Sequence, residues 1–466
     1  MKRKFIIAFI LALLALSFAG TVGADTSKKK HKKHRRTAAQ ANDSTAAPEK
    51  LTRKEERKKH RADRKKQKQE RRQERHREKH EAVTNEHKQN QPAGNKPTAF
   101  KYPATVMKPR YRIDVLASMY LDELVKSGSA TFKDKIPDKA LPGVSFYEGI
   151  SIAADTLKKA GFNIDIYIHD IASASESPEM LISKGIIDSA DLIIGAAPAK
   201  DVLILADYAK KKKINFISAL SPSDGGVKGN KYFTMLQPTL KSHCDWIVDD
   251  ITKKFPGMKV SLLFRTATEA DNNAYLDITS DVRINFRQYL CNTLPGKQEL
   301  AAIFDTTRPN IIIVPVLDAA YADSLLKELS RDFPATHFEV YGMPTWGSIA
   351  DLRKDDAFPN LSINVTTSFS ADNSSPATRY LLHSYKDAYG GKASEYIFHG
   401  YEAMFWFADL LKKYGTFFNL NYNDNSAAPF TRFDVKPQWD NEGHILYNEN
   451  RHILLSKYEG GLYRTE

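Results

Sequence analysis

From Tyr111 onward, short apolar stretches alternate with stretches that have the apolar spacing of helices. This alternation limits the possible folds more than any other feature of the chain. The predicted elements of the first half are, in order, strand Tyr111–Tyr120, helix Phe146–Ala160, strand Asn163–His169, helix Pro178–Gly185, strand Asp191–Gly195, helix Lys200–Lys212 and strand Ile214–Ser218. Strands separated by helices of this length favour right-handed βαβ units and a parallel sheet.

The same order begins again after Tyr232–Pro238, so the sequence predicts a second α/β lobe. Its expected elements are helix Leu240–Lys254, strand Lys259–Phe264, helix Asn273–Phe286, strand Asn310–Val316, helix Ala319–Asp332 and strands His337–Tyr341 and Asn360–Thr366. Two further helices, Thr378–Tyr389 and Glu395–Tyr414, and turn-rich β sequence from Phe430 onward must complete one or both lobes. The predicted fold class is α/β, with two lobes that each surround a parallel central sheet.

Residues 1–24 have the pattern of a cleaved secretory signal peptide. Three basic residues at positions 2–4 precede an apolar run, and the small residues Val22-Gly23-Ala24 follow it. The apolar run is shorter than the roughly 20 residues that a membrane span needs. No cysteine lies near the expected cleavage point at Ala24, so we expect an exported protein that is not a lipoprotein.

Residues 25–98 are predicted to be a basic, disordered or partly helical tract that ends in a linker. The whole chain carries a net charge of +13; residues 28–90 contribute +14 and residues 1–27 contribute +2, which leaves −3 for residues 91–466. The tract lacks aromatic residues and cannot bury enough apolar surface to offset its ordering entropy. The body that follows is slightly acidic, which removes the main compositional support for nucleic-acid binding.

Two interpretations of residues 28–90 remain open. Pairs such as Glu55 with Lys59 stand at helical spacing and would each add a few tenths of a kcal/mol to a solvated helical spacer. The positive charge would instead suit a tether to an anionic envelope surface, such as lipid headgroups or wall polymers. Nucleic acid is not an expected partner, because the tract has no aromatic side chains for base stacking.

The sequence contains no pattern typical of catalysis or of metal binding. G-x-S-x-G, H-E-x-x-H, Walker and G-x-G-x-x-G motifs are all absent, so we predict a protein that is not an enzyme and has no cofactor or metal. For His169-Asp170 we expect a structural role, and for His399 a packing or capping role. Cys244 and Cys291 either form a disulfide or remain as two buried thiols, and the sequence leaves both alternatives open.

Four passages of the body, spread over residues 109–464, resemble type I periplasmic solute-binding proteins, the family of the leucine/isoleucine/valine receptors of ABC importers. They are Phe146–Gly149 with Ala153–Gly161; Ile193–Gly195 with Ile214–Leu220; Tyr389-Gly390 with Gly400–Ala403; and Phe433, Gly443, Asn448, Leu454 and Tyr458–Gly460. Tyr341–Trp346 together with His399–Tyr401 resembles a Bacteroidetes-type envelope subgroup, in which the domain is often fused to a LysM module.

The resemblance implies two Rossmann-like lobes joined by three crossovers, with a ligand in the cleft and a periplasmic location. We expect lobe 1 at residues 99–238, lobe 2 at 239–360, and returning segments that complete both lobes at 361–466. The crossovers are then expected near Leu236–Leu240, Ala357–Ser370 and Asn419–Phe430.

Ligands of open parallel sheets bind at the carboxyl ends of the strands, where helix N-termini offer N–H donors. The candidate ligand-binding residues are therefore Ala197, Ser218, Ala219 and Ser221 in lobe 1 and Arg265, Asp318 and Trp346 in lobe 2. Ser218 and Ser221 are the first choices. The family's amino-acid receptors usually have adjacent hydroxyl residues where this chain has Ala196-Ala197-Pro198, and Pro198 also lacks an N–H.

Each lobe-2 candidate has a structural alternative. Asp318 would bind a ligand ammonium group or act as the N-cap of the helix that it precedes. Arg265 would bind a carboxylate or form a surface ion pair. Trp346 would stack on a ligand or pack in the core.

Two functions follow from these expectations. The first is a receptor that closes its lobes on a small polar ligand, such as one of amino-acid type, and passes it to an ABC permease. The second is a structural or regulatory module of the cell envelope, associated with the wall and tethered by the basic tract. Activators of wall-building synthases use similar folds, which is precedent at the level of fold.

Overall fold

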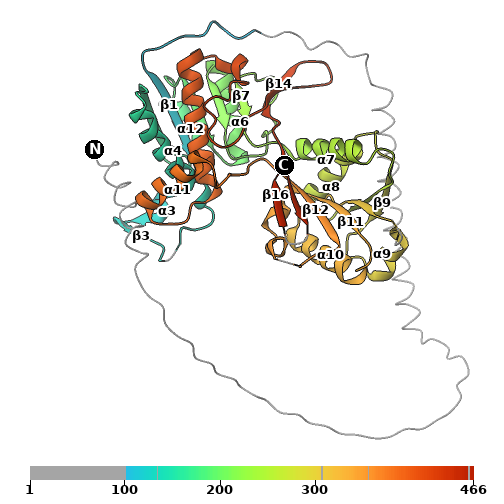
Figure 1. The fold of residues 1–466 in the computed structure, drawn as a ribbon. Coiled ribbons are helices and arrows are strands. Elements are labelled where there is room, and N and C mark those ends of the chain that lie inside the picture. The colour runs from blue at the N-terminus through green and yellow to red at the C-terminus, as the bar shows by residue number, and fades with distance from the viewer. Residues whose placement is uncertain (1–100, 134, 306–307, 355, 460–461, 466) are drawn as a thin grey trace, which may run out of the picture. The chain divides into compact units, whose positions relative to one another are not determined.

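The computed structural model describes residues 101–133, 135–305, 308–354, 356–459 and 462–465 (Figure 1). The predicted signal peptide and basic tract lie outside these residues. The described part of the chain contains two seven-stranded sheets with flanking helices, and a small hairpin of β2 (Val125–Lys126) and β3 (Ser129–Ala130). No helix within these ranges combines the length and the apolar composition that crossing a bilayer requires.

Lobe 1 is built on a sheet with the strand order β13-β14-β7-β6-β5-β1-β4, which is parallel except for β13. Its strands are β1 (Tyr111–Ala117), β4 (Ile164–Asp170), β5 (Leu192–Ala196), β6 (Asn215–Ser218), β7 (Phe233–Met235), β13 (Val435–Trp439) and β14 (Ile445–Asn450). Its helices are α3 (Leu121–Leu124), α4 (Leu141–Lys159), α5 (Pro178–Ser183), α6 (Ala199–Lys212), α11 (Pro376–Tyr389), α12 (Glu395–Tyr414) and the 3-10 helix η3 (Phe418–Asn421). One apolar core lies between the sheet and helices α4, α11 and α12, and a second lies under α5 and α6.

Lobe 2 has a sheet with the order β16-β15-β12-β11-β10-β8-β9, in which β15 pairs antiparallel with both of its neighbours, β12 and β16, and all other pairs are parallel. Its strands are β8 (Val260–Phe264), β9 (Phe286–Leu290), β10 (Asn310–Ile313), β11 (Phe338–Gly342), β12 (Leu361–Thr367), β15 (Leu454–Glu459) and β16 (Leu462–Thr465). Its helices are α7 (Leu240–Lys254), α8 (Glu269–Thr279), α9 (Lys297–Ile303), α10 (Ala319–Asp332), η1 (Pro344–Ser348) and η2 (Ala350–Arg353).

The predicted α/β class with two parallel-sheet lobes is confirmed, and helices α7, α10 and α12 occupy the predicted residues. The helix predicted at Asn273–Phe286 is wrong at both ends. Helix α8 begins earlier, because the hydroxyl of Thr268 caps it by accepting the N–H of Asp271. It ends at Thr279, and Phe286 opens the edge strand β9. The apolar pattern of β9 is weak, because its residues are only half-buried or exposed.

The chain passes between the lobes three times, as expected. The first crossing, residues 236–239, was predicted correctly, and the second begins after β12 at residue 368, at the end of the predicted range. The third crossing lies at residues 451–453, between β14 and β15, so the prediction of Asn419–Phe430 is wrong. That segment stays on lobe 1, where the indole N–H of Trp406 in α12 donates to the carbonyl of Asp424 at 2.8 Å.

Cys244 and Cys291 are separate buried thiols, which is the second of the two alternatives that the sequence left open. Burial raises the pKa of Cys291 to about 11 and raises the pKa of Cys244 as well. Both side chains therefore belong to the apolar core of lobe 2, where they behave as small hydrophobic groups.

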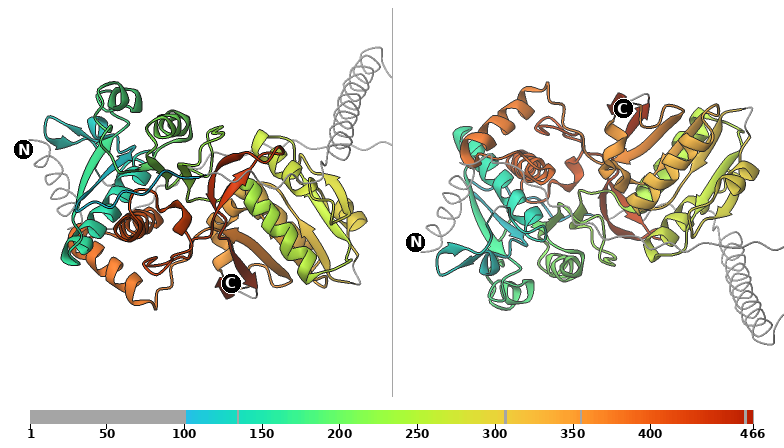
Figure 2. Two further views of the ribbon diagram at one scale, coloured as in Figure 1. Left: turned by 90° about the horizontal axis from the view of Figure 1, so that it is seen from above. Right: turned by 90° about the horizontal axis from the view of Figure 1, so that it is seen from below.

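Helices α4 and α12, far apart in the sequence, lie side by side on one face of the lobe-1 sheet (Figures 1 and 2). Two glycines allow this close approach. A Cβ atom at Gly149 would lie 2.1 Å from the carbonyl oxygen of Ile397, and one at Gly400 would lie 2.1 Å from that of Phe146. On each helix, therefore, a glycine leaves room for the backbone of the other helix to pack against it.

We expect Gly149→Ala and Gly400→Ala each to lower the free energy of unfolding by at least about 1–3 kcal/mol, because a methyl group at either position overlaps a backbone carbonyl. Urea titration checks this. The matched control is Gly347→Ala in η1, where an added Cβ meets nothing within 4 Å. Wild-type stability in both helix variants would contradict the close packing of α4 against α12.

Candidate functional site

The carboxyl edge of the lobe-1 sheet is organised by Asp170, the last residue of β4. Its carboxylate accepts the N–H of Met119 at 2.9 Å, of Leu121 at 2.7 Å and of Ala172 at 3.1 Å, and so it fixes the loop that follows β1. The neighbouring His169 places its Nε2 2.8 Å from a carboxylate oxygen of the buried Asp114. These contacts are structural, as predicted for His169-Asp170.

The four lobe-1 candidates follow β5 and β6 at this same edge. Ala197, the first residue after β5, is buried. Ser218 ends β6, is fully buried and shares the side of the strand that carries Phe216, which faces the core under α6. Ser221 accepts the N–H of Ser223 and donates to its carbonyl, both at 3.2 Å, so its hydroxyl stabilises a turn.

In lobe 2 the structure brings Arg265 and Asp318 together, with 3.3 Å between guanidinium and carboxylate. The same guanidinium lies 4.4 Å from the ring centre of Tyr321. Asp318 is the N-cap of α10 and accepts the N–H groups of Ala320 and Tyr321 at 3.0 and 3.1 Å. These backbone donors and the nearby Arg265 lower the pKa of Asp318. Asp318 therefore acts as an N-cap, while its side chain stays 47% exposed.

Trp346 has the packing role that was its structural alternative. Its side chain is fully buried, and its indole N–H donates to the carbonyl of Val316 at 2.7 Å. The ring lies so close to Gly342 that a Cβ atom there would be 2.1 Å from it. In this arrangement Trp346 presents no ring face to a ligand.

In the described part of the chain, a small pocket lies between the carboxyl edge of lobe 1 and the crossing segments. Ala219 is the one predicted ligand-binding residue among those that line this pocket. The space between its walls is about 300 Å³, part of which is open solvent. Its lining residues are Ala219, Leu236, Gln237, Ser368, Phe369, His399, Glu402, Ala403, Thr431, Phe433 and Asn450. Sequence reasoning missed most of this set, because its members come from six segments that meet only in the folded chain.

Glu402 is the buried acid of this pocket. Burial raises its pKa to about 7, although its carboxylate accepts the N–H of Thr431 at 2.7 Å. His399 lies one turn earlier on α12, where its Nε2 is 3.1 Å from Glu395 and its ring packs against Phe369. The sequence signal for Glu402 was a carboxylate within the apolar pattern of α12, a feature that it shares with Asp409.

Two side-chain contacts tie the crossings to one another. Ser368 in the second crossing donates to the amide oxygen of Gln237 in the first, at 2.7 Å. Glu449, at the end of β14, accepts the N–H of Thr239 at 2.7 Å and the hydroxyl of Ser242 at 2.5 Å, at the start of α7. The first and second crossings are therefore linked directly, and the first is also bonded to β14, the strand that leads into the third crossing.

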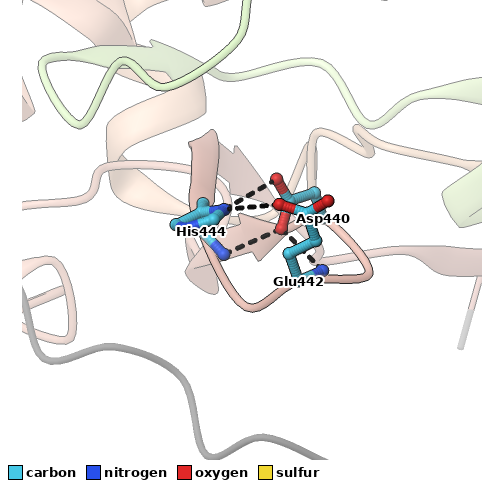
Figure 3. Close-up of side chains that lie close together, drawn as sticks. All are labelled: Asp440, Glu442 and His444. Atoms are coloured by element: carbon cyan, nitrogen blue, oxygen red, sulfur yellow. Dashed lines mark hydrogen bonds and ion pairs between the residues drawn. The ribbon is translucent and has the colours of Figure 1, made fainter. Parts of the chain in front are cut away.

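Three side chains that could supply metal ligands lie in the turn between β13 and β14 (Figure 3). The carboxylate of Asp440 accepts the N–H of Glu442 at 2.9 Å and that of His444 at 2.8 Å. The ring of His444 lies 3.3 Å from the same carboxylate. These bonds within the exposed turn account for the arrangement, and the absence of a metal site remains a prediction.

No family model and no curated protein matches the chain. The fold is similar to that of a putative branched-chain amino acid ABC transporter from Rhodospirillum rubrum (TM-score 0.55, 15% identity, 77% of this chain and 99% of that one). It is also similar to that of an ABC-type branched-chain amino acid transporter from Rhodopseudomonas palustris, with a TM-score of 0.51 and 12% identity. This match covers 76% of this chain and 95% of that one. Full-length LpoA from Haemophilus influenzae also has a similar fold, with a TM-score of 0.52 and 12% identity. This match covers 78% of this chain and 60% of LpoA. The chain therefore has the fold of type I periplasmic-binding proteins.

The raised pKa of Glu402 predicts a contribution that destabilises the folded protein as the pH rises from about 4.5 to 7; it is opposite in sign to the contribution of the buried His243, whose pKa burial lowers to about 4. In this window the folded state holds a proton that the unfolded state, with its ordinary pKa near 4.5, has released. The free energy of unfolding that Glu402 contributes falls by at most about 3 kcal/mol across this window. Glu148, whose buried carboxyl also has a pKa of about 7, lowers the free energy of unfolding in the same direction.

Glu402→Gln should remove this contribution, so that between pH 4.5 and 7 its free energy of unfolding falls less, or rises more, than that of the wild type, as measured by urea titration at several pH values. Glu442→Gln, which changes an exposed side chain of the β13–β14 turn, is the control and should leave the profile unchanged. A profile in Glu402→Gln as steep as that of the wild type would show that Glu402 is ionised in the folded protein at neutral pH.

Proposed function

We propose that this protein is an exported, periplasmic solute-binding protein that closes its two lobes on a small polar ligand for an ABC-type importer. The observation that carries the proposal is the architecture. Two parallel sheets are joined only by the three crossings within the described chain, and the sheet edges expected to bind ligand lie next to these crossings. The similarity in fold to two proteins named as branched-chain amino acid transporters supports this choice.

The two edges offer complementary charges to a ligand of amino-acid type. In lobe 1, α6 begins after Pro198, which has no side-chain acceptor for the N–H groups of the first helical turn. Such N–H groups can bind a carboxylate, which would replace the missing hydroxyl pair at Ala196-Ala197. In lobe 2, the half-exposed carboxylate of Asp318 is available to an ammonium group.

The first test is native mass spectrometry of the chain from Asp25 onward, followed by thermal-shift measurements with amino acids and short peptides. A bound ligand, or a stabilisation that grows with its concentration, is expected from mass action. Asp318→Asn keeps a side-chain oxygen for the N-cap but removes the charge. We expect it to weaken the binding of a ligand with an ammonium group at least about tenfold, since hydrogen bonds to charged groups contribute roughly 1.5–3 kcal/mol.

Asp332→Asn is the matched control, because Asp332 ends the same helix and its charge pairs with Arg331. It should leave the affinity unchanged. Equal affinities of the wild type and Asp318→Asn would rule out Asp318 as a ligand-binding residue. A thermal midpoint that responds to none of the compounds would count against the receptor function itself.

The second candidate is a non-transport envelope module held in place by the basic tract. It is favoured by the similarity in fold to LpoA and by the burial of Ser218 and Trp346, two of the residues expected to face a ligand. In this function the partner is the anionic wall or lipid surface contacted by residues 28–90. As in the first function, the protein is not an enzyme and nucleic acid is not a partner. The LysM-associated subgroup remains a prediction.

Deletion of residues 28–90 separates the two candidates. For the envelope module we expect the deleted protein to leave the wall and membrane fractions in cell fractionation while keeping the thermal stability of the body. A receptor should retain its ligand affinity after the same deletion. Normal fractionation of the deleted protein would contradict the tether.

A further inference from the structure

An extended strap, residues 101–110, runs along the end of lobe 1 where the strands begin (Figure 1). The strap contacts the starts of three strands and the end of one helix. Tyr102 bonds to Lys231 before β7 at 3.0 Å, and Thr105 bonds to Tyr414 at the end of α12 at 2.6 Å. Lys108 pairs with Asp191 before β5 at 2.5 Å, and Arg110 bonds to Asn163 before β4 at 2.8 Å. We call this surface the strap end. It is the opposite end of the sheet from the carboxyl edge, and residues 1–100 join the body here.

Six lysines lie at the strap end: Lys101, Lys210, Lys211, Lys213, Lys228 and Lys231. Two hydrogen bonds connect members of this set. The ammonium of Lys210 lies 3.4 Å from the carbonyl of Lys228, and the ammonium of Lys231 donates to the carbonyl of Lys101. Partial burial and then the charge of Lys213 lower the pKa of Lys231, which places these two side chains within electrostatic reach of each other.

The positive charge of this cluster is largely uncompensated. Within the described residues, none of the first five lysines has a carboxylate within 4.0 Å, whereas the neighbouring Lys212 is paired with Asp188 at 2.7 Å. The partial negative charge at the end of α6 favours Lys210 and Lys211 there. It does not account for Lys101 and Lys228, which lie in loops. The cluster is therefore positive although residues 91–466 as a whole are acidic.

Large apolar side chains are exposed at the same end. Val106 and Met107 on the strap are 50% and 57% exposed, and Leu420 in η3 is 75% exposed. Asn419, next to Leu420, hydrogen-bonds to Asn215 at the start of β6, which places η3 at the strap end. Lysines beside exposed apolar residues are the combination that binds the interface of an anionic membrane, since the ammonium groups meet headgroups while apolar side chains enter the acyl boundary.

We propose that the strap end of lobe 1 docks on the surface of an anionic lipid bilayer. Charge complementarity and the exposed apolar residues select this partner, and residues 28–90, which precede the strap in the sequence, carry a further +14. Docking in this way leaves the carboxyl edge of lobe 1 at the far end of the sheet from the lipid. The proposal concerns a surface of the folded body and does not depend on which ligand the protein binds.

The test measures binding of the chain from Asp25 onward to vesicles of 70% phosphatidylcholine and 30% phosphatidylglycerol by flotation. The variant Lys210→Gln/Lys211→Gln/Lys213→Gln should bind at least about tenfold more weakly, because each lysine near an anionic surface contributes about fivefold in affinity. Lys253→Gln/Lys259→Gln/Lys297→Gln removes the same charge from exposed positions of lobe 2 and should bind like the wild type. Equal binding of the two triple variants would overturn the proposal.

A second measurement separates the strap end from the basic tract. A polarity-sensitive fluorophore is attached at Met107→Cys or, as a control, at the exposed lobe-2 position Val282→Cys; both native cysteines are buried. With the anionic vesicles, the label at position 107 should shift to the blue and be quenched by brominated lipids, while the label at 282 should not respond. Vesicle binding without a response at position 107 would show that the tract alone attaches the chain, and would overturn the proposal. Retention on wall polymer with no binding to vesicles would overturn it as well.

Discussion

The glycine contact between α4 and α12 is the constraint on which the rest of lobe 1 depends. Only a backbone without a side chain at Gly149 and Gly400 can approach the facing carbonyl groups this closely, and the contact brings the returning C-terminal segment against the first long helix of the body. The same turn of α12 carries His399 and Glu402 into the pocket beside the crossings. A packing requirement thus sets the position of two groups that have the chemistry to interact with a ligand.

Several polar groups at the carboxyl edges of both sheets serve the protein itself. Asp170 holds the loop after β1, Ser221 stabilises a turn, and Asp318 caps α10 while it pairs with Arg265. Hydrogen bonds among the protein's own polar groups are expected at sheet edges, because a buried polar group without a hydrogen-bond partner lowers the stability of the fold. Selectivity for a ligand would therefore depend on backbone N–H groups and on the exposed part of Asp318 more than on a set of free hydroxyl groups.

The two ends of the lobe-1 sheet differ in chemistry. The carboxyl end carries the loops and the pocket, whereas the strap end carries lysines without carboxylate partners among the described residues, together with exposed apolar side chains. This polarity follows from the βαβ topology, which places every helix C-terminus, with its preference for lysine, at the end where the strands begin. The strap lies at that end, so the proposed membrane docking and the proposed ligand binding would use opposite ends of one sheet.

The alternation of apolar stretches by itself determined the α/β class, the two lobes and most of the longer helices, because helix and strand periodicities are local properties of the chain; it gave no signal for the short α3 and α9. Capping signals had the same local character, and so Asp318 could be predicted as the N-cap of α10. Only the tertiary structure decided the third crossing at 451–453, the burial of Trp346 against Gly342, and the pocket around Glu402. Each of these depends on which distant segments pack against each other, and a single sequence carries no local signal for that choice.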